Sequence, residues 1–283
     1  MPLSETGYTA LRVTRDGAVA TVTLDNPPLN TLDRALAADL IRVAREARDD
    51  ESLRVIVVES ADPEFFLAHA DINWMFDPAD LMALADDEGD PNLNPLQQLH
   101  ERFRTLPQVT IAKLRGRLRA GGAEFAMAAD MRFAARGETW FAQAETRMGI
   151  FPGGGGTQYL TRLVGRARAL EVILGADLYD TGLAERYGWI NRAVAPEELD
   201  GFVDRLAHRI AAIPSGVVEA AVQAVDSAEA GGAVPNLLEE AQAHVKVYPA
   251  PQSVVDRIRR AVAAGVQTRE GELDLEGLFD RLG

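Results

Sequence analysis

The sequence predicts an α/β fold that ends in a helical C-terminal part. Short apolar segments at residues 54–59, 109–114 and 131–135 are each followed by a loop or small-residue turn and a helical pattern, and this alternation is typical of α/β proteins. Nearly continuous apolar runs indicate strands that are covered on both faces. Residues 234–283 are helical in pattern and charged. The pattern leaves open whether the units form a doubly wound sheet or a spiral.

The N-terminal segment predicts a β-hairpin followed by a helix. In residues 8–24, apolar residues alternate with polar ones on either side of the turn sequence Asp16-Gly17. The sequence Asn26-Pro27-Pro28 ends the second strand because proline cannot donate to a sheet ladder. Apolar residues at helical spacing then predict a helix over residues 32–48.

The rest of the chain predicts loops, further helices and one short strand. We expect a loop over residues 60–71 and a mobile surface segment or lid over residues 77–95, which are rich in Asp, Pro and Asn. Further helical patterns, and one short strand near residues 191–194, complete the chain. One helix is expected in the second half of the stretch 116–130, opening on Gly121-Gly122, and others at about residues 96–105, 159–164, 166–174, 181–187, 196–212 and 215–229.

Composition restricts the chemistry and the partners. The chain has 283 residues, a formal net charge of −14 and no cysteine. The negative charge disfavours nucleic acid and anionic membranes as partners. Disulfides and thiolate chemistry are excluded, and no two histidines stand at metal-ligand spacing, so no metal is expected. Because no signal-peptide core or membrane-spanning run is visible, a cytoplasmic protein is expected.

Glu124 is the sharpest candidate for chemistry. It is the one carboxylate in an apolar helical segment that opens on Gly121-Gly122. A carboxyl group in apolar surroundings tends to have a raised pKa and can exchange a proton near neutral pH. The free N–H groups at the start of the helix can face an anion. The structural alternative is an acid that is paired with a cation such as Arg119 or Arg132.

Three other features are ambiguous when each is taken alone. Glu145 lies among uncharged neighbours, but it precedes Arg147 and could simply begin a surface helix. The glycine run 153–156 lacks the pattern of a phosphate loop or a dinucleotide fingerprint, so a close backbone approach is favoured over nucleotide binding. His69 could touch a substrate or could be an ordinary solvated histidine. The cluster Trp74-Met75-Phe76 could line an acyl pocket, although an ordinary apolar cluster is favoured.

Four sequence blocks, in order, resemble the crotonase superfamily, the enoyl-CoA hydratase/isomerase family. The similarity covers about residues 8–230. The blocks are Asp25-Asn26-Pro27-Pro28-Leu29-Asn30-Thr31-Leu32, Ala68-His69-Ala70-Asp71-Ile72, Ala120-Gly121-Gly122-Ala123-Glu124 with Ala129-Asp130, and Phe141-Ala142-Gln143-Ala144-Glu145 with the glycine-rich loop 149–158.

The resemblance implies a crotonase-like spiral of ββα units over residues 1–205. It also implies a helical C-terminal region over residues 206–283 that is used in trimerisation, so a homotrimer or hexamer is expected. The substrate would be an acyl-CoA thioester, with coenzyme A as part of the substrate and no separate cofactor. The backbone N–H groups of Ala70 and Gly121 would form an oxyanion hole for the thioester oxygen.

By the same resemblance, Glu124 and Glu145 would hold a water molecule and add it across the 2,3 double bond, which is the reaction of a hydro-lyase. Gly153 would help to position the two acids and the water molecule. Ala68, Ala70 and Ile72 would present backbone groups to the adenine of coenzyme A. His69 stands where a glycine is usual, so it could alter the oxyanion loop or place an imidazole near the thioester. Other readings are an isomerase or C–C bond lyase of the same superfamily, a non-catalytic acyl-CoA-binding protein, or Rossmann-type nucleotide binding.

Overall fold

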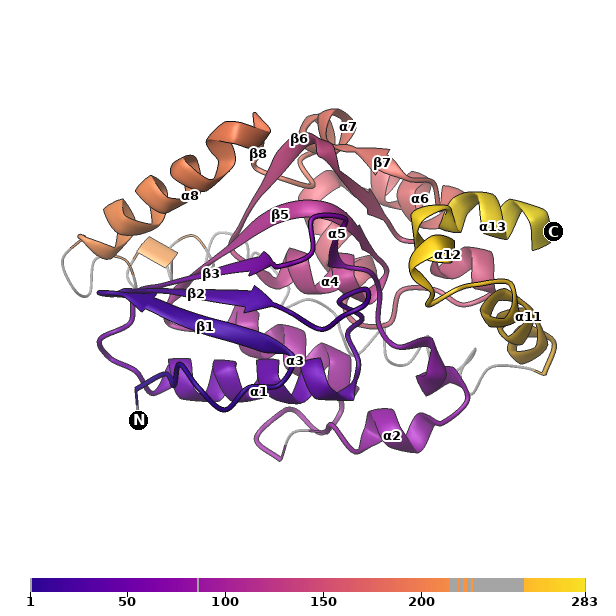
Figure 1. Ribbon diagram of the computed structural model, residues 1–283, viewed down its shortest axis with the longest axis horizontal. Helices are drawn as coiled ribbons and strands as arrows, with labels where there is room; N and C mark the ends of the chain where they lie inside the picture. Colours follow the sequence, from indigo (N-terminus) through magenta and orange to yellow (C-terminus); the bar gives the residue numbers. More distant parts are fainter. Residues whose placement is uncertain are drawn as a thin grey trace.

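The computed structural model describes residues 2–85, 87–213 and 252–282, together with residues 218, 221, 222 and 225. In these residues, eight strands form one sheet in the order β1-β2-β3-β5-β6-β7, with β4 paired to β5 and β8 paired to β6 (Figure 1). The strands are β1 Leu11–Asp16, β2 Val19–Leu24, β3 Val55–Ser60, β4 Phe65–Leu67, β5 Val109–Arg119, β6 Met131–Ala142, β7 Tyr179–Asp180 and β8 Arg192–Val194.

The pairing of the strands confirms the predicted α/β class. The β1–β2 hairpin is antiparallel, as its turn sequence predicts, with Val13 opposite Val22. The central pairs β2–β3, β3–β5 and β5–β6 are parallel. Parallel neighbours need a crossover connection, and the intervening helices supply it.

Two strand predictions were too short, and one loop prediction was wrong. β5 and β6 extend well beyond the predicted residues 109–114 and 131–135, and β4 lies inside the predicted loop 60–71. The reason is a bend at Gly116, where φ is +70° and an added Cβ would lie 2.3 Å from the Glu64 carbonyl carbon. The first part of β5 pairs with β3, whereas the part after the bend pairs with β4.

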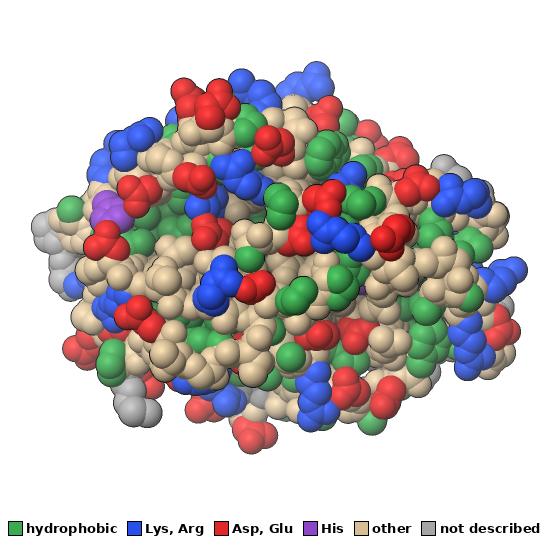
Figure 2. Space-filling model, viewed as in Figure 1, with side chains coloured by type: hydrophobic (Ala, Val, Ile, Leu, Met, Phe, Trp, Pro, Cys, Tyr) green, Lys and Arg blue, Asp and Glu red, His purple; other side chains and the backbone are tan. Residues whose placement is uncertain are grey.

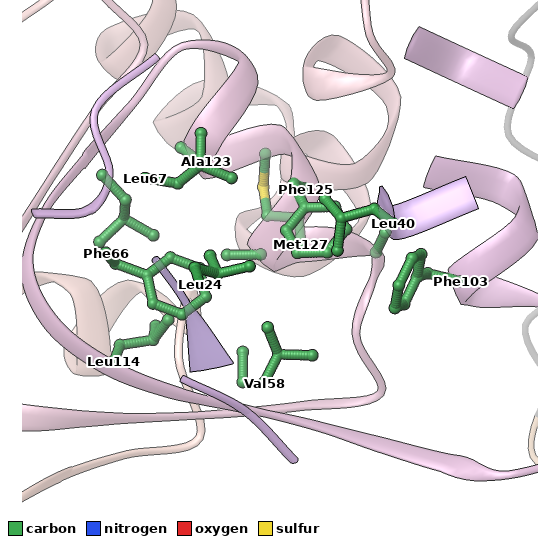
Figure 3. Close-up of a cluster of buried hydrophobic side chains, with 14 of the residues drawn as sticks. Leu24, Leu40, Val58, Phe66, Leu67, Phe103, Leu114, Ala123, Phe125 and Met127 are labelled. Atoms are coloured by element: carbon green, nitrogen blue, oxygen red, sulfur yellow. The ribbon is translucent and has the colours of Figure 1, made fainter. Parts of the chain in front are cut away.

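The sheet is covered on both faces, as its apolar strands predict. Helices α1, α3 and α4 pack on one face and α8 packs on the opposite face (Figure 1). Figure 3 shows the larger core, in which Leu24, Val58 and Leu114 from the strands meet Phe125 and Met127 of α4. The helices up to this point are α1 Arg34–Arg48, α2 Pro78–Met82, α3 Pro95–Arg104, α4 Gly121–Ala128, α5 Gly156–Val164, α6 Arg166–Gly175, α7 Thr181–Tyr187 and α8 Pro196–Ala211.

Three C-terminal helices close over the loops at one end of the core. They are α11 Gln252–Ala263, α12 Arg269–Leu273 and α13 Leu275–Leu282. Ile258, Leu278 and neighbouring apolar residues pack against Ile72 and Met148 of the core, at the side of the molecule drawn in yellow in Figure 1. The C-terminal part is therefore helical where it is described, as predicted.

Two predictions, one of a helix and one of a domain boundary, do not correspond to elements that the structure describes. The helix expected at residues 215–229 falls almost entirely outside the described residues, and so does the region 226–251. The boundary expected between residues 205 and 206 falls within α8, and the division into two domains stays a prediction. Among the described residues, no helix is long and apolar enough to cross a membrane. The face drawn in Figure 2 carries interspersed acidic and basic side chains.

Candidate active site

The structure brings most of the predicted site residues together around one cavity of about 350 Å³. Both predicted acids line it, as do Ala70 and Gly121. His69, Ile72 and Gly153 from the sequence prediction also lie there. The rest of the lining is mainly apolar and comes from the loop after β4, the segment 81–96, the residues around Met148, and the C-terminal helices.

Ala68 is the one predicted site residue that does not line this cavity. It is fully buried, its N–H donates to Asn30 O (3.3 Å), and its carbonyl accepts from the Arg119 N–H (3.2 Å). A larger cavity of about 540 Å³ lies between α8 and the residues 127–132 and contains none of the predicted site residues. The choice of the cavity of about 350 Å³ therefore rests on chemistry rather than on size.

Glu124 is held by the glycine-rich loop. It lies in the first turn of α4 with 2% of its surface exposed, and its Oε1 accepts hydrogen bonds from the N–H groups of Gly154 (2.9 Å) and Gly156 (2.8 Å). A Cβ on Gly154 would lie 2.5 Å from Glu124 Oε2. The glycines thus allow the backbone to approach a carboxylate, whereas the sequence predicted an approach to a ligand or to another backbone segment.

The two cations that were considered as partners for Glu124 make other contacts. Arg119 bonds to the C-terminal helices, and Arg132 donates to the carbonyls of Trp189 (3.0 Å) and Ala129 (2.5 Å). Backbone N–H donors rather than these cations hold the Oε1 of Glu124. Hydrogen bonds of this kind, from N–H groups to an ionised carboxylate, stabilise the carboxylate.

His100 lies beneath the same glycine loop. It is fully buried in α3, and its Nδ1 lies 2.6 Å from Gly154 O, so Nδ1 carries the proton. Its Nε2 is buried without a hydrogen-bond partner among the described residues. Burial lowers the pKa of His100 to about 4, and the bond to Gly154 offsets only part of that effect. This imidazole is therefore neutral near neutral pH, and its link to the glycine loop was not predicted from the sequence.

Glu145 is buried rather than on the surface, so its interpretation as the start of a surface helix was wrong. It opens the short 3₁₀ turn Glu145–Met148 and is 5% exposed. With its amide nitrogen turned toward the acid, the buried Gln143 donates to both carboxylate oxygens at 3.0 and 3.1 Å. The acid reaches the cavity because β6 runs on to Ala142 and delivers it there.

Ala70 and Gly121 lie side by side. A Cβ on Gly121 would be 2.7 Å from Ala70 Cβ and 3.2 Å from Ala70 N. Gly121 begins α4, so its N–H has no partner within the helix. Leu32 and Ala70 form an isolated parallel bridge. In this bridge the Leu32 N–H donates to His69 O and the Asp71 N–H donates to Leu32 O, so the Ala70 N–H points away from Leu32.

The residue before Gly121 is in a strained conformation. Ala120 has φ of +48° and ψ of −128°, a region that side chains with a Cβ rarely adopt. Such a residue costs on the order of 1–3 kcal/mol and is typical of functional sites. Because the Ala120–Gly121 peptide carries the Gly121 N–H, this backbone geometry sets where that N–H points. Nothing in the sequence signalled this strain.

His69 is also buried, but it is surrounded by charge. Its Nδ1 lies 2.9 Å from Ala70 O and its Nε2 lies 2.9 Å from Glu272 Oε1. Burial alone would lower the pKa of His69, but the Glu272 carboxylate outweighs burial and raises it. Glu272 and its contact with His69 were missed in the sequence because 203 residues separate them. His69 is therefore not the ordinary solvated histidine of the alternative reading.

Trp74 and Met75 both line the cavity, so the apolar cluster predicted around them contributes to the pocket. Phe76 is 37% exposed and does not line it. In the described part of the chain, no group of three or more potential ligands could hold a metal ion.

Residues 14–265 match the family model described as "Enoyl-CoA hydratase/isomerase". It is 31% identical over 213 residues to a short-chain-enoyl-CoA hydratase of Clostridium acetobutylicum, a match that covers 75% of this chain and 79% of the relative. A fatty acid oxidation complex subunit alpha of Shewanella baltica is 30% identical over 265 residues, covering 89% of this chain. The match spans only 36% of that longer protein.

Among solved structures, a candidate enoyl-CoA hydratase from Streptomyces avermitilis superimposes with a TM-score of 0.90 at 46% sequence identity. The match covers 98% of this chain and 99% of that one. These similarities confirm the predicted crotonase-like fold. Of the two arrangements that the sequence pattern left open, they support the spiral and not the doubly wound sheet.

Proposed function

The chain belongs to the enoyl-CoA hydratase/isomerase family, and on that premise we propose that it adds water across the 2,3 double bond of an acyl-CoA thioester. In this proposal Glu124 and Glu145 are the acid–base pair, and the N–H groups of Ala70 and Gly121 bind the thioester oxygen. The observation that carries the proposal is the convergence of two buried carboxylates and two adjacent backbone donors on one apolar cavity.

The acids have the support that general acid–base catalysis needs. Glu124 is fixed by two backbone N–H groups, and Glu145 is fixed by the Gln143 amide. A water molecule held by the pair would lose its proton to one carboxylate as its oxygen bonds to C3. The other acid would deliver a proton to C2. Together the two steps add one water molecule to the double bond, and each acid contributes about 10²–10⁴-fold to the rate in typical enzymes.

The backbone donors supply the electrophilic part of the reaction. When the water oxygen bonds to C3, negative charge develops on the thioester oxygen as an enolate. Two N–H groups already oriented toward that position stabilise the charge without reorganisation. The start of α4 adds the positive end of the helix dipole at Gly121. The apolar walls, including Trp74, exclude water and strengthen these interactions.

The test is turnover of a panel of 2-enoyl-CoA thioesters of increasing chain length, with products identified by mass spectrometry. The wild-type protein is expected to form 3-hydroxyacyl-CoA. Glu124→Gln and Glu145→Gln should each reduce kcat by about 10²–10⁴-fold. Glu138→Gln, which alters an exposed carboxylate on β6 paired with Arg115, is the control and should retain wild-type kcat.

Full activity in both acid variants would contradict the mechanism. Double-bond migration or C–C cleavage as the only product would replace hydration by another reaction of the family.

The association state belongs to this proposal as well. We infer a homotrimer or hexamer from the family resemblance, and light scattering of the purified chain measures it directly. A monomeric mass at assay concentration would contradict the inference without affecting the proposed chemistry.

A further inference from the structure

A cluster of four charged side chains includes the residue before Ala70 and the residue two positions before Gly121, the two proposed oxyanion donors. It joins His69 and Arg119, which come from the core, to Glu272 of α12 and Glu276 of α13. The side chains of Arg119 and Glu272 are completely inaccessible to solvent, and that of His69 is 6% exposed. Two cations and two anions balance, as a buried cluster requires.

The contacts of His69 require a proton on both of its ring nitrogens. The carbonyl oxygen of Ala70 can only accept a hydrogen bond, and the same holds for the ionised carboxylate of Glu272. Since each ring nitrogen lies 2.9 Å from one of these oxygens, both must donate. Two further contacts favour the ionised form of Glu272: its Oε1 also accepts from the Gln267 N–H at 2.7 Å, and its Oε2 lies 3.7 Å from Arg119 Nη1, an ion pair in which neither atom has a hydrogen-bond partner among the described residues.

The bond from His69 to Ala70 O restricts one oxyanion donor. The imidazole and the backbone from His69 to Ala70 O form a closed ring, and the Ala70 N–H belongs to the peptide within that ring. The His69 carbonyl is fixed on the other side by the Leu32 N–H at 2.9 Å. Rotation of the His69–Ala70 peptide would break one of these bonds, so the direction of the Ala70 N–H is set by them.

Arg119 also bonds to Glu272 and restricts the backbone next to the second proposed donor, Gly121. Its Nη2 donates to Glu272 O (3.0 Å) and its Nε donates to Glu276 Oε1 (3.0 Å), while its backbone N–H donates to Ala68 O (3.2 Å). Arg119 lies two residues before Gly121 and adjoins the strained Ala120. A residue held at both backbone and side chain can maintain that strain.

We propose that Glu272 is a positioning residue for the oxyanion hole, because its carboxylate holds His69 as an imidazolium next to the Ala70 donor, while its backbone carbonyl holds Arg119, two residues before the Gly121 donor. The proposal rests on the proposed function for its catalytic consequence. His69 lines the cavity, so its positive charge also lies on the side where the enolate develops. The charged groups that face His69 are Glu272 from α12 and Arg119 from β5, with Glu276 from α13 behind Arg119 and the two proposed catalytic acids across the cavity.

The protonation state can be measured without any substrate. Imidazole ¹⁵N–¹H spectra of the wild-type protein at pH 7 should include a histidine signal with both nitrogens protonated that His69→Gln removes, which assigns it to His69 and separates it from the exposed His208 beside Asp16 and Asp204. In Glu272→Gln the His69 ring should become neutral at the same pH. A neutral His69 in the wild-type protein would overturn the proposal whether or not the protein is a hydratase.

Kinetics test the positioning role. Glu272→Gln keeps an acceptor for His69 but removes the charge, and it should lower kcat about 10- to 100-fold with KM within about twofold, as expected for donors displaced by a fraction of an ångström. The alkaline limb of the pH–rate profile should move to lower pH, because His69 then loses its proton more easily.

The matched control is Arg269→Gln, which weakens the attachment of the same helix α12 to Asp62 and Glu64 but does not touch the charge cluster. It should leave both kcat and the alkaline limb unchanged. If Glu272→Gln lowers kcat with an unmoved alkaline limb, or if Arg269→Gln moves the limb equally, Glu272 acts only on stability and the proposal fails. If the wild-type protein hydrates none of the thioesters, the proposed function fails, while the spectra still decide the state of His69.

Discussion

In the described part of the chain, two histidines are buried, His69 and His100, and they share one kind of contact and differ in the other. In His69 and in His100, Nδ1 bonds to a backbone carbonyl, that of Ala70 or of Gly154. The Nε2 of His69 meets the Glu272 carboxylate, whereas the Nε2 of His100 has no partner among the described residues. The pKa of His69 is accordingly raised and that of His100 is lowered to about 4.

The comparison shows that burial alone does not fix the charge of a histidine. Burial disfavours the imidazolium in both cases, and only a neighbouring carboxylate reverses the outcome. The two sides of the cavity are therefore built differently. On the side of the two acids, uncharged groups and backbone N–H donors hold Glu124. On the side of the proposed oxyanion hole, charged side chains within two residues of the proposed donors bond to backbone carbonyls. The following changes test this division, from the largest expected effect to the smallest.

The largest effect is expected on the oxyanion side from Gly121→Ala. The new Cβ would lie 2.7 Å from Ala70 Cβ, so the two donor peptides must separate. We expect kcat to fall about 10²–10³-fold, which is typical for loss of one oxyanion donor. Steady-state kinetics on the best thioester measures this. Gly175→Ala is the control, because a Cβ there would meet only Asp177 Oδ2 at 4.0 Å. Wild-type turnover by Gly121→Ala would remove Gly121 from the proposed machinery.

On the side of the acids, His100 should make stability depend on pH. The unfolded histidine titrates near 6.5, so between about pH 6.5 and pH 4 the unfolded chain takes up a proton that the folded chain does not. The free energy of unfolding should therefore fall as the pH falls, by about 3 kcal/mol in total from this one group.

Urea unfolding of the wild-type protein and of His100→Asn at pH 7 and pH 4.5 measures this contribution. The asparagine keeps a donor near Gly154 O but cannot titrate, so the variant should lose less stability between the two pH values. An identical loss in both proteins would contradict the buried neutral state. His69 should act in the opposite sense: its contribution is complete below its unfolded pKa and is lost as the pH rises through its raised folded pKa.

The smallest effect is expected from Asn94→Ala. Asn94 caps α3, with its side chain accepting from the Gln97 N–H, and its Nδ2 donates to Gly153 O at 2.7 Å. Loss of the cap should cost about 1 kcal/mol in the free energy of unfolding. Loss of the second bond should loosen the glycine loop that holds Glu124 and reduce kcat severalfold. Asp180→Ala, which removes a comparable cap from α7, should lower stability but leave kcat unchanged. Equal kcat in the two variants would indicate that Asn94 serves α3 alone.

Much of the fold could be predicted from local pattern. The hairpin, the parallel strands, helix α4 and the helical C-terminal part all depend on apolar periodicity and turn residues that lie close together in the chain. The errors arose where local pattern gives no signal. β4 is only three residues long, and the extensions of β5 and β6 are visible only once Gly116 and its approach to Glu64 are placed.

For the site, the sequence by itself determined the two acids, the glycine loop and the neighbourhood of Ala70 and Gly121, because each lies in a short block with a recognisable order. The tertiary structure decided how these groups are held. The contact between His69 and Glu272 joins residues 203 positions apart, and the bond from His100 to Gly154 spans 54. The charge of a buried group depends on the partner that the fold brings to it, and that partner is set by the folded chain as a whole.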